Sequence, residues 1–151
     1  MPLHRLRYNQ ILPITMDEAW TFFSNPANLC RITPDWLCFD IRYQESREMY
    51  PGMIIEYTIR AIASIPMRWV TEITHVDKPG FFVDEQRLGP YRFWHHQHHF
   101  KGCVQGTEMT DIITYSMRLG LLAEPVHRLI VKPRLERIFS FRQQALENIF
   151  G

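Results

Sequence analysis

The chain has 151 residues, of which 46% are hydrophobic and 22% charged, and its formal net charge is +1. These values are typical of one globular domain spanning residues 1–151, and the near-neutral charge argues against a nucleic-acid partner, which requires a basic excess. The three cysteines lack a CxxC spacing, and no run is apolar enough for a signal peptide or a membrane span, so we expect a cytoplasmic protein with reduced thiols and no stable membrane insertion.

The first 34 residues predict a strand followed by two short helices. Residues 3–12 alternate loosely between polar and apolar side chains, as a half-buried strand does. Thr15 and Glu18 have the spacing of a capping box, and apolar residues follow at helical spacing. Asn25-Pro26 ends this helix and begins a second one, which we expect to run through Ile32.

From residue 36 to residue 118 the hydrophobic pattern changes to a period of two, which indicates strands. Six such stretches follow one another, and turn signals such as Pro51-Gly52 separate them. The first stretch covers residues 36–43. Consecutive strands with short connections predict an antiparallel meander.

After Gly120 the pattern is helical again, and one apolar stripe marks the face that we expect to pack against the concave side of the sheet. The stripe consists of Leu135, Ile138, Phe139, Leu146, Ile149 and Phe150. Pro133 must kink this helix or split it, because proline lacks a backbone N–H and clashes with the preceding turn. Arg142 interrupts the stripe, which leaves two placements: its side chain reaches a carboxylate in the cavity, or it extends along the surface to solvent. We favour the second.

Several stretches of the sequence resemble the SRPBCC superfamily, the START, birch-pollen-allergen and polyketide-cyclase group. They are "LPITMDEAWTFFSNPANLCRITP", "GMIIEYTI", "IPMRW", "FVDEQRLGPYRFWHHQHHF", "GTEMTDIITY" and "RIFSFRQQAL". The resemblance covers nearly the whole chain and is strongest to small bacterial single-domain ligand-binding members. It implies an α+β helix-grip fold, in which a curved antiparallel sheet wraps around a long C-terminal helix, with two short helices after the first strand. The family implies small apolar ligands such as lipids, quinones, polyketides or other aromatic compounds, but a fold alone does not fix one activity.

Four of the chain's seven histidines lie between Arg92 and Phe100. Side chains two apart share a face of a strand. One face therefore carries Trp94, His96, His98 and Phe100, and the other carries Phe93, His95, Gln97 and His99. We assign His96 and His98 to the concave face. The next strand should place Asp111 beside one of them, because a buried carboxylate needs a partner.

We interpret His96, His98 and Asp111 as a polar network that orients a ligand in an otherwise apolar pocket. The first alternative is a cyclase- or dehydratase-type enzyme that uses a His–Asp pair from these three candidate catalytic residues. The second alternative is a non-catalytic interaction module with a filled core. We expect no cofactor and no metal ion, because two in-line histidines and one carboxylate are too few constraints for a tuned metal site.

The expected ligand is elongated and mostly apolar, with its polar end at the histidines. The predicted ligand-binding residues are Tyr57, Trp69, Trp94, His96, His98, Met109, Asp111, Tyr115 and Phe139. At least one of Asp84, Glu85 and Gln86 should also face inward, but the turn after this strand leaves the register open. The sequence leaves the oligomeric state open as well, a homodimer included.

Overall fold

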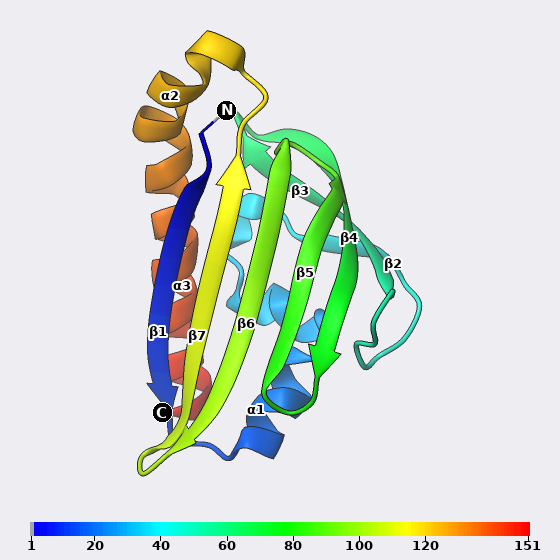
Figure 1. Cartoon of the computed structure of the whole chain (residues 1–151), viewed down its shortest axis with the longest axis vertical. Helices are drawn as coiled ribbons and strands as arrows, with labels where there is room; N and C mark the ends of the chain where they lie inside the picture. The colour runs from blue at the N-terminus through cyan, green and yellow to red at the C-terminus, as the bar shows by residue number, and fades with distance from the viewer. Residues whose placement is uncertain (1) are drawn as a thin grey trace.

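Seven strands form one antiparallel sheet in the order β1-β7-β6-β5-β4-β3-β2 (Figure 1). The computed structural model describes residues 2–151, apart from the side chains of residues 61 and 62. The strands are β1 (His4–Leu12), β2 (Asp40–Gln44), β3 (Ile54–Ile62), β4 (Ile65–Asp77), β5 (Phe81–Leu88), β6 (Phe93–Cys103) and β7 (Gly106–Ser116). The helical segments are α1 (Met16–Phe23), η1 (Pro26–Ile32), η2 (Asp35–Leu37), η3 (Gly120–Leu122), α2 (Ala123–Val126), η4 (His127–Val131) and α3 (Lys132–Phe150).

The sheet curves around α3, which runs along its length behind β1 and β7 (Figure 1). Leu135, Phe139 and Leu146 of the predicted stripe are buried in the core between helix and sheet. The predicted α+β helix-grip fold is therefore confirmed. No helix among residues 2–151 is both long and apolar enough to cross a membrane.

The predicted capping box fixes the start of α1. Thr15 Oγ1 accepts a hydrogen bond from the Glu18 amide at 3.2 Å, and the Thr15 amide donates to Glu18 Oε2 at 2.7 Å. These two bonds satisfy amides that have no partner inside the helix. The helix then buries Ala19, Trp20 and Phe22, so it covers the end of the sheet where the chain leaves β1.

The prediction of a strand over residues 36–43 was wrong for the first half of that range. Asp35–Leu37 form a 3₁₀ turn that ends at Cys38, whose φ of 48° is left-handed, and β2 begins only at Asp40. Pro34 precedes this turn, and the Cys38 amide donates to the Asp35 carbonyl at 2.9 Å. The alternation of Leu37 with Phe39 therefore reflects two side chains that point into the interior from a turn, not from a strand.

Pro133 divides the C-terminal helical region, as its chemistry predicts. It occupies the first turn of α3, and the π-helical segment η4 lies directly before it. A wider π-helical turn accommodates a residue that breaks the regular hydrogen-bond ladder. Ala123 and Val131 are buried, so the part of the helical region before the proline still packs against the sheet.

Candidate ligand pocket with a histidine–carboxylate cluster

Strand β6 presents its two central histidines to the interior. His96 is 5% exposed and His98 is 8% exposed, and Trp94 and Phe100 are buried on the same face. His95 and His99 lie on the opposite face and are half-buried. The predicted assignment of the two faces is therefore confirmed. The His96 and His98 rings stack with their centroids 3.8 Å apart.

Asp111 joins the two histidines from the neighbouring strand. It lies opposite His98 in the β6–β7 register. Its Oδ1 is 2.8 Å from His96 Nε2 and 3.2 Å from His98 Nδ1. The sequence predicted one histidine beside Asp111, and the structure places both there.

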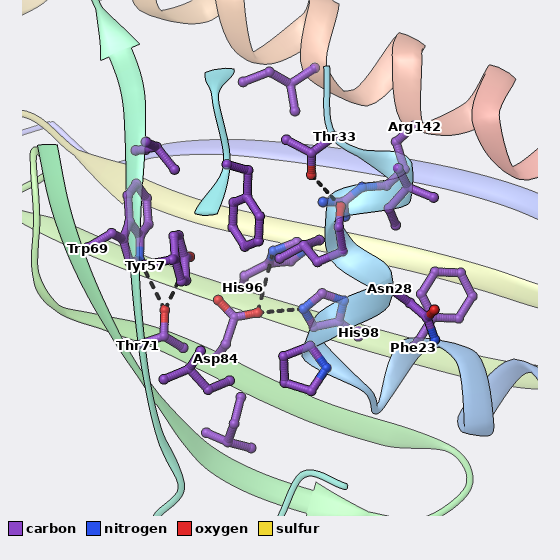
Figure 2. A pocket seen from close by; sticks show the side chains of 18 of the residues that line it. Phe23, Asn28, Thr33, Tyr57, Trp69, Thr71, Asp84, His96, His98 and Arg142 are labelled. Carbon is purple, nitrogen blue, oxygen red and sulfur yellow. Dashed lines mark hydrogen bonds and ion pairs between the residues drawn. The ribbon is translucent and has the colours of Figure 1, made fainter. Parts of the chain in front are cut away.

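Asp84 approaches the same histidines from the other side, on β5 (Figure 2). Its Oδ2 lies 2.6 Å from His98 Nε2 and 3.7 Å from His96 Nδ1. The β5–β6 register pairs Asp84 with His96, which resolves the choice that the sequence left open among Asp84, Glu85 and Gln86. Gln86 also turns toward the interior side, but its side chain is held by the backbone of Tyr91.

Arg142 corrects one prediction, because its side chain is buried and lines the pocket instead of reaching solvent. Its guanidinium lies over the Phe139 ring at 4.8 Å, and Nη1 is 3.8 Å from Asp111 Oδ1. The buried carboxylate attracts the cation inward, and the aromatic face offers it a second favourable contact. The sequence shows Arg142 within an apolar stripe, but it does not show the opposing charge.

The pKa values of the two histidines are shifted in opposite directions. Burial lowers the pKa of His96, and the nearby His98 lowers it further, which outweighs the attraction of the carboxylates. Burial also acts to lower the pKa of His98, but its hydrogen bonds to Asp111 and Asp84 reverse the effect and raise that pKa. His96 is therefore neutral under conditions in which His98 is a cation.

The two carboxylates stay ionised in spite of their burial. Burial acts to raise the pKa of Asp111 and of Asp84, but the hydrogen bonds and positive charge of the histidines lower both values below the ordinary range. Arg142 is permanently charged. The cluster thus contains two anions and two cations, and its charges balance within the interior.

A cavity of about 160 Å³ lies between the sheet, η1 and α3. Six of the nine predicted ligand-binding residues line it, namely Tyr57, Trp69, Trp94, His96, His98 and Phe139. Thr71 Oγ1 accepts a hydrogen bond from Trp69 Nε1 at 3.0 Å and lies 3.3 Å from the Tyr57 hydroxyl (Figure 2). These contacts fix two aromatic walls of the cavity, so their orientation does not depend on a ligand.

The other three predicted ligand-binding residues, Met109, Asp111 and Tyr115, do not line this cavity. Met109 packs in the core cluster around Trp20 and Phe100. Asp111 lies behind the histidines, and Tyr115 packs in the core, where its hydroxyl contacts His127. Strand parity correctly predicted that all three point inward, but these side chains pack against the core and the histidines instead of the cavity.

Asp84, His96 and His98 offer metal-ligand atoms within 4.8 Å of one another. Both nitrogens of His98 face carboxylate oxygens, and Nε2 of His96 is engaged by Asp111. Metal ligation requires imidazole nitrogens with a free lone pair. In this arrangement carboxylates hold three of the four imidazole nitrogens, and the absence of a metal ion at this cluster stays a prediction.

Comparison with known proteins bears on the fold. Neither a protein-family model nor a curated protein sequence matches the chain. Among solved structures, ginseng major latex-like protein 151 from Panax ginseng superposes with a TM-score of 0.67 at 12% identity, over 98% of this chain and 97% of that chain. Ara h 8.0201 superposes with a TM-score of 0.61 at 15% identity, over 97% of this chain and 99% of that chain. The chain therefore shares the fold of these proteins.

The same fold is seen in a bacterial protein. Protein Ms6760 from Mycobacterium smegmatis superposes with a TM-score of 0.65 at 17% identity, over 96% of this chain and 92% of that chain. At such identities the likeness establishes the fold and no activity. The function of this protein must therefore be inferred from its cavity and polar cluster.

Acidification is expected to destabilise the protein, because Asp84 and Asp111 have lowered pKa values in the folded state. Exposed carboxyls titrate near pH 4, so the stability that these two supply is complete above about pH 4 and is lost as the pH falls through their folded pKa values. His98, whose pKa is raised, supplies stability below about pH 6.5 that is lost as the pH rises through its folded pKa, and His96 acts in the opposite sense.

Urea unfolding from about pH 8 to about pH 3 measures this dependence. The Asp84→Asn variant should lose less stability on acidification than the unmodified protein. A free energy of unfolding that stays constant below about pH 4 would contradict the ionised state of the two carboxylates.

Proposed function

We propose that the protein binds a compact, mostly apolar molecule that carries a hydroxyl group, in the cavity between the sheet and α3. One observation carries the proposal. An aromatic-walled cavity of about 160 Å³ ends at a cluster of two carboxylates, two histidines and an arginine, namely the half-buried Asp84 and the buried His96, His98, Asp111 and Arg142. Small-molecule sites typically combine apolar walls with a few fixed polar groups in this way.

The size of the cavity favours a compact ligand over the elongated one expected from the sequence. A dry apolar cavity of about 150 Å³ is enough to take up benzene. The cavity of this protein, at about 160 Å³, therefore suits a ligand with one aromatic ring and a short substituent. Trp69 and Trp94 line its wall and pack edge to face at 5.3 Å, so they offer ring faces and edges to such a ligand.

The polar end of the cavity offers hydrogen-bond acceptors. Neutral His96 must carry its proton on Nε2, because the Asp111 carboxylate beside that nitrogen can only accept. The Nδ1 atom of His96 then carries no proton, and its lone pair can accept a hydrogen bond. Both histidine contacts of Asp84 go to Oδ2, which leaves Oδ1 to accept from a ligand. Two acceptors at the end of an apolar cavity call for a donor on the ligand, and a hydroxyl is the smallest one.

A matched pair of ligands tests this assignment. The protein is expected to bind 4-ethylphenol about tenfold or more tightly than ethylbenzene, because a hydrogen bond to a charged acceptor contributes about 1.5–3 kcal/mol. The advantage should largely disappear in the Asp84→Asn variant. Isothermal titration calorimetry measures both affinities.

The control variant is Glu85→Gln, one residue further along β5, whose carboxylate contacts Arg87 and His95 instead of the cavity. It should retain the preference for the phenol. Equal affinities for the two ligands in the unmodified protein would contradict the hydroxyl assignment, and a preference that survives in Asp84→Asn would exclude Asp84 as the acceptor. Binding of neither ligand below about 1 mM would sink the pocket proposal itself.

Acid–base catalysis is the second candidate function, and one specific observation favours it. Two stacked histidines share the same carboxylates, yet one has a lowered pKa and the other a raised pKa. Neighbouring groups whose pKa values are separated in this way can divide the roles of base and acid. His96 would accept a proton at Nδ1, as a cyclase- or dehydratase-type reaction requires of its base, and His98, whose two nitrogens contact Asp84 and Asp111, would supply positive charge beside it. Turnover of an activated polyketide substrate that is lost in His96→Gln, while binding is kept, would establish it.

A further inference from the structure

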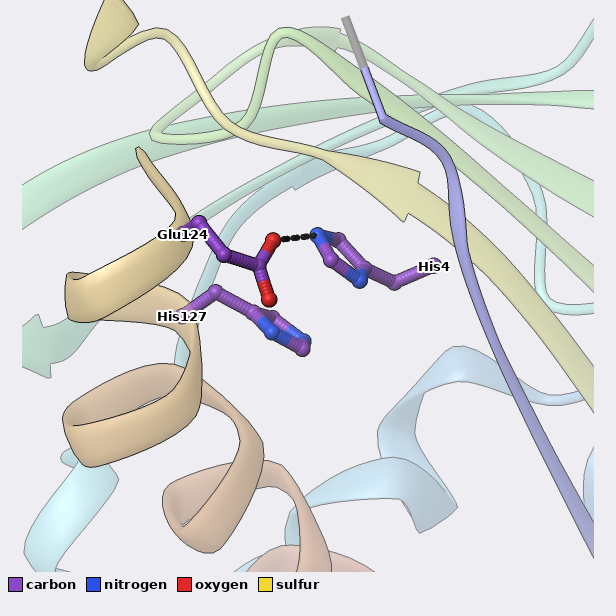
Figure 3. Close-up of side chains that lie close together, drawn as sticks. All are labelled: His4, Glu124 and His127. Carbon is purple, nitrogen blue, oxygen red and sulfur yellow. Dashed lines mark ion pairs between the residues drawn. The ribbon is translucent and has the colours of Figure 1, made fainter. Parts of the chain in front are cut away.

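One side chain near the start of the sequence meets two from the helical region after β7, at the end of the sheet opposite α1 (Figures 1 and 3). They are His4 at the start of β1, Glu124 in α2 and His127 at the start of η4. Their ligand atoms all lie within 4.8 Å of one another. We propose that these three residues bind a divalent transition-metal ion of the zinc class, at a site separate from the ligand pocket.

The donor set matches that class of ion. Two imidazoles and one carboxylate are a common set of three protein ligands for zinc, with water in the remaining position. Magnesium and calcium prefer oxygen ligands, so two histidines argue against them. Glu124 and His127 are three residues apart on a continuous helical run, which places both side chains on one face.

The present spacing requires only a small adjustment to hold an ion. Bonds of about 2.0–2.1 Å in a tetrahedral site place neighbouring ligand atoms roughly 3.4 Å apart. His4 Nε2 is already 3.8 Å from Glu124 Oε2. The His4 and His127 rings are stacked with centroids 3.4 Å apart, so a rotation of the His4 ring would turn its nitrogen toward the ion. The Glu124 side chain is 61% exposed and is free to follow.

His127 supplies an independent observation that points to a ligand. The residue is only 6% exposed, and its buried Nδ1 has no hydrogen-bond partner among residues 2–151. Its other nitrogen, Nε2, lies 2.6 Å from the hydroxyl of buried Tyr115. Metal-binding histidines usually hold their second nitrogen in such a bond, which orients the ring and sets the tautomer. A buried nitrogen without a partner is costly, and a metal ion would satisfy it.

The contrast with the pocket cluster supports the choice of site. In the pocket, Asp84 and Asp111 occupy the histidine nitrogens that face them. At the His4 site the only carboxylate is exposed and lies 3.8 Å from His4, and Nδ1 of His127 is unpaired among the described residues. A buried imidazole nitrogen without a partner is therefore offered here, whereas in the pocket carboxylates hold three of the four imidazole nitrogens and leave only His96 Nδ1. His127 also begins the π-helical segment η4, and π-helical turns occur frequently at functional sites.

The proposal is tested by titrating zinc into the chelator-treated full chain in an isothermal titration calorimeter. One ion per chain is expected to bind with an affinity tighter than about 100 μM. The variants His4→Ala and Glu124→Gln should each weaken binding by about tenfold or more, as should Tyr115→Phe, which removes only the hydroxyl that holds His127. Cobalt titrations should give the intense visible absorption of a four- or five-coordinate ion, which is lost in the same variants.

Two controls separate this site from other sources of binding. His75→Ala removes an exposed histidine elsewhere, and Asp84→Asn alters the pocket cluster; neither should change the zinc affinity. The proposal is overturned if no ion binds below about 100 μM, or if binding is unchanged in His4→Ala and Glu124→Gln. Binding that Asp84→Asn abolishes would assign the ion to the pocket and would equally overturn it.

Discussion

Replacing Asp111 with asparagine is expected to lower the free energy of unfolding by about 3–5 kcal/mol, the usual cost of removing one partner from a buried ion pair. Asp111 is 2% exposed and contacts His96, His98 and Arg142. Without its charge, the buried cations His98 and Arg142 would share Asp84 alone. Asparagine keeps the shape of the side chain, so the loss measures charge and not packing.

Urea unfolding at pH 7, followed by tryptophan fluorescence, gives this value. Glu108→Gln is the matched control, because Glu108 lies on the opposite face of the same strand and is only half-buried, with a hydrogen bond from Asn9. Its effect should stay within about 0.5 kcal/mol. A loss of less than about 1 kcal/mol in Asp111→Asn would show that the cluster does not hold two buried cations.

Replacing Gly106 with alanine is expected to cost about 3 kcal/mol or more, because a strained φ and a backbone clash act together. Gly106 begins β7 with a φ of 137°, a value that L side chains rarely adopt. A Cβ at this position would lie 2.2 Å from the Leu12 carbonyl oxygen and 2.9 Å from the Ile14 amide nitrogen. The end of β1 and the connection to α1 would have to move away.

Gly52→Ala separates the two contributions. Gly52 also has a positive φ, of 93°, but a Cβ there would meet no atom within 4 Å. This variant should lose only the strain, about 1–3 kcal/mol, and so less than Gly106→Ala. Thermal unfolding of both variants makes the comparison, and equal losses would mean that the close approach of β1 does not constrain Gly106.

The order of strands and helices could be predicted because local patterns determine it. A period of two on β6 placed His96 inward, and the Thr15–Glu18 spacing fixed the start of α1. The region around Leu37 failed because a turn can also bury alternating side chains. Leu37 and Phe39 help to line the cavity, so their burial comes from contacts with residues far away in the sequence. A short window of sequence does not show these contacts.

The polar cluster was only half predictable, because charge pairing across strands depends on register. Asp111 could be placed beside the histidines through the tight β6–β7 connection, whereas the register of Asp84 depended on a longer turn. Arg142 was misassigned because the carboxylate that attracts it lies 31 positions away in the sequence. The same limit hid the cluster of His4 and His127, which only the fold brings together.

A crystal structure of the protein with 4-ethylphenol tests the central claim most directly. We predict electron density for one ring in the cavity beside Trp69 and Trp94, with its hydroxyl within hydrogen-bond distance of Asp84 Oδ1 or His96 Nδ1. Density for the phenol confined to the outer surface, with only water in the cavity at a saturating concentration, would contradict the account.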